Sequence, residues 1–138
     1  MSMEDILTKR GLVSGGMRHL SPTETIEAIK EGAFLVDVRP EPLVAIKAFA
    51  VEGVIYCPYF DFADHLDLIP KTKPLILADA AGLRSKECVQ KLLDKGYTQV
   101  ANLAGGIMDW ERDGYPVVKI PGRELNGPCL CMLRSGRH

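Results

Sequence analysis

One stretch constrains the fold of this chain more than any other. It is an apolar run, Leu75–Ala78, that stops at Asp79 and passes through Ala80, Ala81 and Gly82 into a helical pattern. The run has no polar side chain to turn toward solvent, which is typical of a central parallel strand covered on both faces. The small residues that follow allow a tight turn with inward amides, and inward amides beside a helix N-terminus favour negative charge. The stretch therefore predicts a buried strand that ends in an anion-binding loop.

The rest of the chain alternates strand and helix patterns. Strands are predicted at 17–20, 34–40, 51–58, 75–78 and 99–103, and helices at 21–32, 41–50, 60–68 and 85–95, the second of these weakly. The first helix has the clearest start, because Ser21, Pro22 and Glu24 combine a capping box with proline at the first position. This alternation predicts an α/β fold, a single domain with a central parallel sheet of about five strands, helices on both faces and right-handed connections.

A chain of 138 residues is expected to form one domain. Residues 1–16 are polar and end in Ser14-Gly15-Gly16, which predicts a flexible leader or a helix docked through Ile6 and Leu7. The domain itself is assigned to residues 17–118. Residues 119–138 are interrupted by glycine and proline and form a C-terminal tail that carries Cys129 and Cys131.

Composition excludes several classes of partner. The formal net charge is -1, which gives no electrostatic reason to expect nucleic acid or an anionic membrane. No apolar run approaches the ~20 residues of a spanning helix, and residues 1–10 do not resemble a signal peptide. A cytoplasmic protein with reduced thiols is expected, and the four cysteines lack the paired spacing of a zinc site. Neither a metal nor a cofactor is predicted.

The loop after the buried strand resembles the active loop of the rhodanese-like domains, which reads Cys-x-x-Gly-x-Arg-Ser. Here Gly82, Arg84 and Ser85 match, whereas Asp79 stands where the family has the cysteine that carries a persulfide. The resemblance places the active-site loop at Ala80, Ala81, Gly82, Leu83, Arg84 and Ser85. It implies a sulfurtransferase fold in which the position of the nucleophile is occupied by aspartate.

Two further motifs extend the resemblance to about residues 18–118. Asp37-Val38-Arg39 is similar to the Asp-Val-Arg that ends a strand in the family, and a buried ion pair or cap is expected there. Leu103, Gly105, Gly106 and Trp110 follow the family's Leu-x-Gly-Gly-x-x-x-Trp. The two glycines are expected to let a turn pass close to neighbouring backbone, and Trp110 is expected in the core because it lies one helical turn after Gly106.

The departure at Asp79 decides what activity the resemblance implies. Members of the family take sulfane sulfur from a donor such as thiosulfate onto a cysteine and pass it to a thiol or to cyanide. A carboxylate is a poor acceptor of sulfane sulfur, so Asp79 is expected to fill the loop with its own charge and to accept amide hydrogen bonds. Phosphatase relatives place one more residue before the arginine, and no metal-binding acids lie near Asp79, so phosphoryl transfer is not expected either.

Two functional hypotheses follow. The first is a binding or regulatory module with an unidentified protein partner. The second is a divergent sulfur-transfer or thiol-redox protein that exchanges sulfur with a donor or acceptor through Cys129 and Cys131, whose basic neighbours would activate the thiols. Alternatively, the two cysteines contribute two soft ligands to a shared metal site, or the pair has no function. Cys88 is expected to be buried and inert, and Cys57 is left open.

Overall fold

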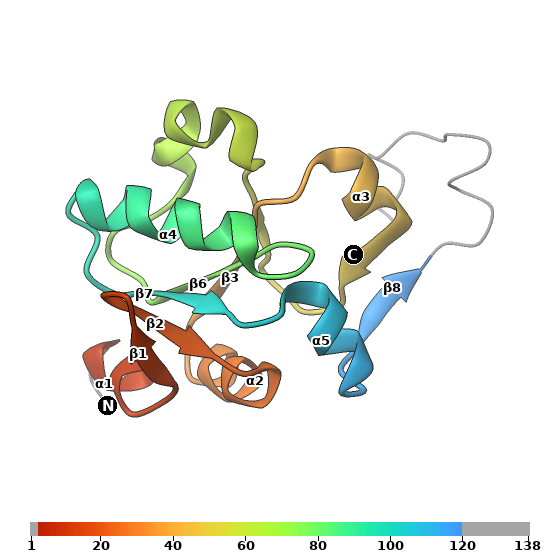
Figure 1. Cartoon of the computed structure of the whole chain (residues 1–138), viewed down its shortest axis with the longest axis horizontal. Helices are drawn as coiled ribbons and strands as arrows, with labels where there is room; N and C mark the ends of the chain where they lie inside the picture. Colours follow the sequence, from red (N-terminus) through yellow and green to blue (C-terminus); the bar gives the residue numbers. More distant parts are fainter. Residues whose placement is uncertain (1–2, 120–138) are drawn as a thin grey trace.

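The computed structural model describes residues 3–119, and within them the central sheet has six strands in the order β1-β2-β7-β6-β3-β5 (Figure 1). Their bounds are β1 Leu12–Ser14, β2 Met17–Leu20, β3 Phe34–Asp37, β5 Ile55–Tyr56, β6 Leu75–Ala78 and β7 Val100–Leu103. Neighbouring strands run parallel except in the β1–β2 hairpin. The predicted α/β fold with a parallel central sheet is therefore confirmed, and the antiparallel β1 is an addition to it.

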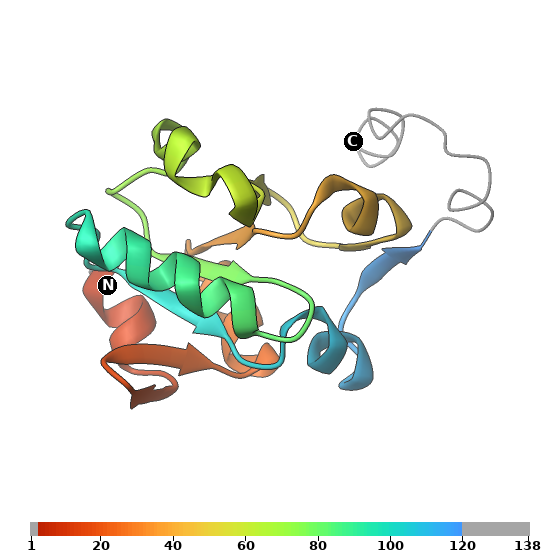
Figure 2. The ribbon, with the colours of Figure 1, turned by 45° about the horizontal axis from the view of Figure 1, so that its top comes forward.

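Helices cover both faces of this sheet. They are α1 Met3–Thr8, α2 Pro22–Lys30, α3 Glu41–Ile46, the 3-10 helix η1 Tyr59–Leu68, α4 Leu83–Asp94 and α5 Gly106–Arg112. Figure 2 shows α4 and η1 on one side of the sheet and α1 and α2 on the other. Successive residues of β6 face opposite sides, as they must in a strand. Leu75 and Leu77 pack with Val89 and Leu92 of α4, whereas Ile76 packs in the cluster that contains α2.

The start of α2 has the predicted capping box. The Ser21 hydroxyl accepts a hydrogen bond from the Glu24 amide, and the Glu24 carboxylate accepts one from the Ser21 amide. Glu24 also accepts a hydrogen bond from the Gly11 amide at 2.9 Å. Burial alone would raise the pKa of Glu24, but these amide hydrogen bonds outweigh it and hold that pKa below its usual value.

The described residues before 17 belong to the folded domain, as a helix and as an edge strand of the sheet. Ile6 and Leu7 of α1 are buried in the same cluster as α2, and Arg10 pairs with Glu31 at 2.6 Å. Ser14-Gly15-Gly16 was interpreted from the sequence as the end of a leader. In the structure Ser14 ends β1, and Gly15-Gly16 forms the turn of the β1–β2 hairpin with both glycines at positive φ. Of the two states expected for residues 1–16, the helical one agrees with α1.

The second sheet was not predicted. The weak helix expected at 41–50 ends at Ile46, and Lys47–Phe49 instead forms β4, which pairs antiparallel with β8 Val117–Lys119. Ala48 and Phe49 are fully buried. The helical prediction for this half of the segment was wrong because burial and pairing with a distant strand overrode local propensity. The strand expected at 51–58 is likewise shorter, with only Ile55–Tyr56 in the ladder.

Candidate functional site

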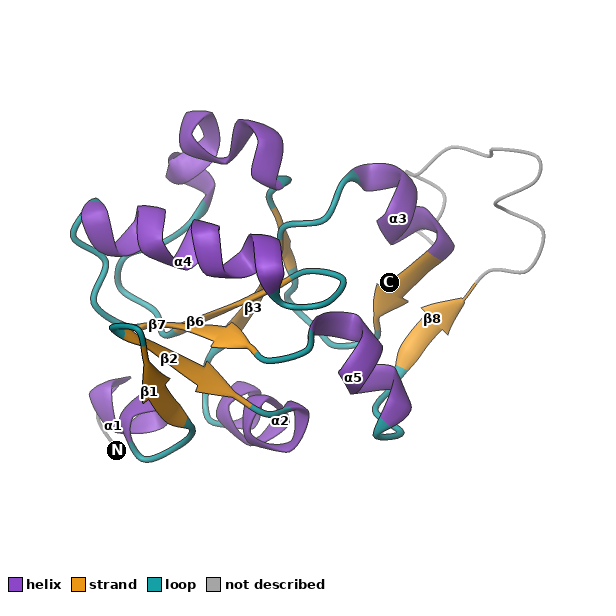
Figure 3. Ribbon diagram, viewed as in Figure 1, coloured by secondary structure: helices purple, strands orange, loops and turns teal. Residues whose placement is uncertain are grey.

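The site predicted from the sequence lies at the carboxyl end of β6, where the chain turns into α4. Figure 3 shows this loop beside the start of α5. Asp79 is buried with 5% of its surface exposed, and Gly82 and Ser85 are buried with it. Ala80, Ala81, Leu83 and Arg84 are exposed. Gly82 precedes α4 in the left-handed region, with φ of 91°, so glycine is favoured at this point of the turn.

Backbone amides of the loop surround the Asp79 carboxylate. The Arg84 amide donates to Oδ2 at 2.6 Å, the Ser85 amide donates to the same oxygen at 3.3 Å, and the Gly82 amide donates to Oδ1. The first turn of a helix otherwise leaves such amides without partners. The loop therefore forms the anion-binding arrangement expected from the sequence, and its own aspartate occupies it.

The glycine pair before Trp110 holds α5 against this loop. The Ile107 amide donates to the Asp79 carbonyl at 2.9 Å, and the Met108 amide donates to the Ala80 carbonyl at 3.1 Å. A Cβ atom on Gly106 would lie 2.5 Å from the Asp79 carbonyl oxygen. The predicted close approach of backbone is therefore confirmed.

Trp110 has no exposed surface and packs edge-on against Phe49 with ring centroids 5.2 Å apart. Its indole Nε1 donates to the Pro116 carbonyl at 2.8 Å. The expected core position of Trp110 is confirmed, and these neighbours lie in β4 and in the turn that precedes β8.

Arg84 contributes its backbone amide to the loop, whereas its charged side chain contacts residues outside the loop. Its guanidinium lies over the ring of Tyr59, 4.9 Å from the centroid, and Nη1 is 3.4 Å from a Glu87 carboxylate oxygen. Among residues 3–119, no cationic side chain forms an ion pair with Asp79. The negative charge of Asp79 is thus stabilised by amide dipoles and by the helix N-terminus.

A short polar chain leads from the loop across two neighbouring strands. The Ser85 hydroxyl lies 3.5 Å from Asp79 Oδ1 and donates to Asn102 Oδ1, while Asn102 Nδ2 is 3.2 Å from His19 Nδ1. Neither Asn102 nor His19 was predicted from the sequence as a site residue. The detectable signal was Asn102 itself, which is the one polar residue of β7 and is 1% exposed.

Asp37 and Arg39 form the buried ion pair that the sequence predicted. Arg39 Nη2 donates to Asp37 Oδ2 at 2.7 Å, and Nη1 donates to the Lys47 carbonyl at 2.9 Å. The pair joins the end of β3 to β4, so its role here is structural.

Two of the four cysteines lie in the described part of the chain, and both are buried and free. Burial, together with the charges of Asp61 and Asp67, raises the pKa of Cys57 to about 11. Burial raises the pKa of Cys88 to about 12. Both side chains are therefore thiols at neutral pH, as expected for Cys88. Cys129 and Cys131 lie outside the described residues.

Residues 3–119 were also searched for metal-binding groups and for membrane-spanning helices. They contain no group of three or more His, Cys, Asp or Glu side chains that would hold a metal ion. None of their helices is both long enough and apolar enough to cross a bilayer.

Comparison with known proteins gives a consistent pattern. Residues 21–113 match the rhodanese-like domain. The chain is 30% identical to a sulfurtransferase of Allochromatium vinosum over 92 residues, which is 67% of this chain and 84% of the relative. It is 30% identical to the thiosulfate sulfurtransferase GlpE of Actinobacillus pleuropneumoniae over 71% of this chain and 90% of that protein. A crystal structure of a rhodanese-related protein from Thermoplasma volcanium superposes with a TM-score of 0.67 at 26% identity, covering 73% of this chain and 97% of that one.

Proposed function

The chain belongs to the rhodanese-like domain family, and we propose that it is a member without ordinary thiosulfate sulfurtransferase activity, acting as a binding or regulatory module. The observation that carries this proposal is the buried Asp79 carboxylate at the centre of the amides of Gly82, Arg84 and Ser85. By the match of the loop to the family pattern, Asp79 takes the place of the cysteine that would carry the persulfide. Its partner is inferred to be another protein, and a cytoplasmic location belongs to the same proposal.

The chemistry of sulfur transfer supports this assignment. In the family reaction a cysteine thiolate attacks the sulfane sulfur of thiosulfate, an S–S bond forms, and sulfite leaves with the electron pair of the broken bond. A carboxylate oxygen offers no comparable acceptor, and the buried thiols of Cys57 and Cys88 are protonated at neutral pH. Within residues 3–119 no side chain is therefore suited to carry the sulfur.

Electrostatics supports the same proposal. The amides that would bind an anionic donor already bind Asp79, whose carboxylate is nearly removed from solvent. A thiosulfate dianion entering the loop would meet a fixed negative charge and would have to displace it from its hydrogen bonds. Both effects oppose binding of the donor, independently of the missing thiol.

A cyanolysis assay tests the proposal. The full chain is incubated with thiosulfate and cyanide, thiocyanate is measured, and a variant with Cys57, Cys88, Cys129 and Cys131 all replaced by serine serves as control. We expect no thiocyanate above the uncatalysed background from either protein. Turnover that persists without any cysteine would contradict the argument that this loop needs a thiol.

A second candidate function rests on the sulfurtransferase relatives together with the Cys129-Leu130-Cys131 segment. Arg134 and Arg137 follow that segment closely, and nearby cationic side chains lower thiol pKa values. If this pair carries sulfur, mass spectrometry after incubation with a persulfide donor will find a mass increase of one sulfur atom on a peptide that contains it. Thiocyanate formation would then be lost when Cys129 and Cys131 alone are replaced by serine.

A further inference from the structure

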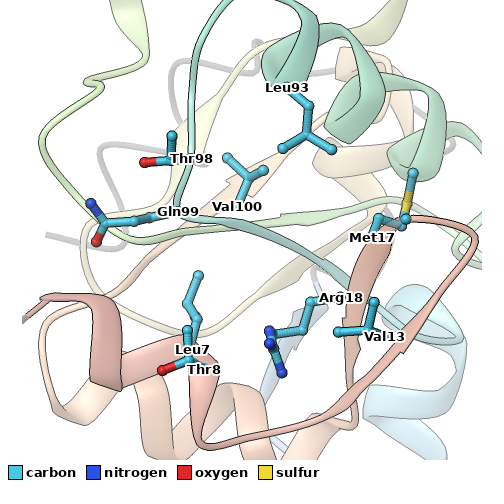
Figure 4. Close-up of a pocket in the computed structure, with 10 residues that line it drawn as sticks. Leu7, Thr8, Val13, Met17, Arg18, Leu93, Thr98, Gln99 and Val100 are labelled. Atoms are coloured by element: carbon cyan, nitrogen blue, oxygen red, sulfur yellow. The ribbon is translucent and has the colours of Figure 1, made fainter.

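The polar chain that ends at Asp79 crosses the sheet on the side of α4. Met17 packs on that side, whereas Arg18 points toward α1, and both line a cavity at the amino end of the parallel strands (Figure 4). Alternate residues of a strand face opposite sides, so His19 shares the α4 side with Met17. His19 is half-buried there, beside Asn102, which is its partner in the β2–β7 register.

Each hydrogen bond in this chain has a direction. Asn102 Nδ2 lies 3.2 Å from His19 Nδ1, and an amide nitrogen only donates, so this Nδ1 carries no proton. Nε2 of the same ring lies 3.4 Å from the Ser14 carbonyl and carries the hydrogen of the neutral histidine. At the other end, the single hydrogen of the Ser85 hydroxyl goes to Asn102 Oδ1, while Asp79 Oδ1 lies 3.5 Å away.

Protonation of His19 reverses these directions. A proton on Nδ1 would face the amide nitrogen of Asn102, which leaves two donors opposed and no acceptor between them. A half-turn of the amide removes the conflict, because its oxygen and nitrogen are nearly alike in size and exchange places. Oδ1 then accepts from His19 and Nδ2 donates to the Ser85 hydroxyl, whose own hydrogen turns to its other acceptor, Asp79 Oδ1.

Burial couples the three bonds. Ser85 is fully buried, Asn102 is 1% exposed and Asp79 is 5% exposed. A buried donor or acceptor that loses its partner has no water to replace it, so the bonds reverse together. His19 is the member of the chain with the most access to solvent, and histidine side chains gain and lose a proton between about pH 5 and 8.

The charged groups around His19 do not titrate in that range. β1 and β7 contribute no titratable side chain, and Arg18 lies on the opposite face of β2 with the charged residues of α1 and α2 (Figure 2). On α4, Lys86 lies on the edge nearest β2, two helical turns before the residue that lines the cavity. On α5, Asp109 is paired with Arg112. Side chains of these types keep their charge between about pH 5 and 8, which leaves His19 as the group that responds.

We propose that this chain is a pH-sensitive switch, in which protonation of His19 redirects the Ser85 hydroxyl to the Asp79 carboxylate. Above the titration of the histidine, the hydroxyl donates to Asn102. Below it, the carboxylate gains an O–H donor in addition to its three amide donors, and the loop is held more tightly. The proton comes from solvent and stays on the imidazole, so only hydrogen bonds change. The switch is internal to the domain and does not depend on the function proposed above.

Nuclear magnetic resonance of the full chain tests the switch. The ring of His19, the side-chain amide of Asn102 and the carboxyl carbon of Asp79 are followed from about pH 8 to 5. We expect the amide and carboxyl signals to change with the same midpoint as the ring. A carboxyl signal of Asp79 that does not follow the histidine would overturn the proposal.

Variants separate the switch from the electric field of the histidine charge. Ser85→Ala keeps that charge but removes the hydroxyl, so the histidine-linked change at Asp79 should be lost, and its persistence would overturn the proposal. His19→Gln should abolish the change at both Asn102 and Asp79. His65→Gln, the loss of an exposed histidine on η1, should leave it unaltered. If Ser85→Ala fails to fold, equal pH responses of the two histidine variants would overturn the proposal instead.

Discussion

Replacing Asp79 by cysteine measures how strongly the loop favours an anion at its centre. A free thiol has a pKa near ~8.5. Hydrogen bonds from the Arg84 and Ser85 amides would stabilise the thiolate by about 1.5 kcal/mol each, and the helix N-terminus by about 1 kcal/mol. Burial at a position only 5% exposed opposes this by about 1.5 kcal/mol. The net of about 2.5 kcal/mol, at ~1.4 kcal/mol for each pH unit, lowers the pKa of the introduced thiol to about 6.7.

The assay is the pH dependence of alkylation by iodoacetamide, followed by mass spectrometry. Cys57 and Cys88, whose pKa values are about 11 and about 12, are protonated at neutral pH and are not expected to be alkylated. Cys129 and Cys131 are replaced by serine. At pH 7 the introduced thiol should be about two-thirds ionised, against about 3% for an unperturbed one.

Ala81→Cys is the matched control, because Ala81 lies in the same loop but is exposed. Its thiol should titrate near ~8.5, since no amide points toward it in the way that three point toward Asp79. Equal pKa values at the two positions would refute the claim that this loop favours an anion. A higher pKa at position 79 would show that burial outweighs the amides.

Three further outcomes are expected. Trp110→Ala should lower the free energy of unfolding by about 3 to 5 kcal/mol, measured by urea denaturation with circular dichroism, and a loss below about 1 kcal/mol would contradict its fully buried position. Gly106→Ala should cost about 2 to 4 kcal/mol because its Cβ would meet the Asp79 carbonyl, whereas Gly114→Ala, which meets nothing within 4 Å but shares the positive φ, should cost only about 1 kcal/mol. Glu24, whose folded pKa is lowered below 4.5, adds stability that is present above that pH and lost as the pH falls through the folded value, so Glu24→Gln should flatten the acid limb of a plot of stability against pH.

The loop at Asp79 shows which features of a site can be predicted from local sequence. The small residues 80–82 and the helix start required inward amides, and the amides of Arg84 and Ser85 do point at the carboxylate. The direction of the Arg84 side chain could not be predicted from the neighbouring sequence. It depends on Tyr59, which lies in another element and 25 positions earlier in the chain.

The sequence by itself determined the elements whose cause is local. Leu75–Ala78 is a strand because every residue in it is apolar, and α2 begins where Ser21 and Glu24 cap each other. It also placed Trp110 in the core through its spacing from Gly106.

Only the tertiary structure decided the features that join distant segments. Lys47–Phe49 has a helical sequence pattern but pairs as a strand with Val117–Lys119. Asn102 contacts His19 because β7 and β2 are neighbours in the sheet. The same is true of the cavity at the amino end of the parallel strands, whose lining residues come from α1, β1, β2, α4 and β7. Helix propensity and capping act over a few residues, whereas strand pairing and burial depend on which segments the folded chain brings together.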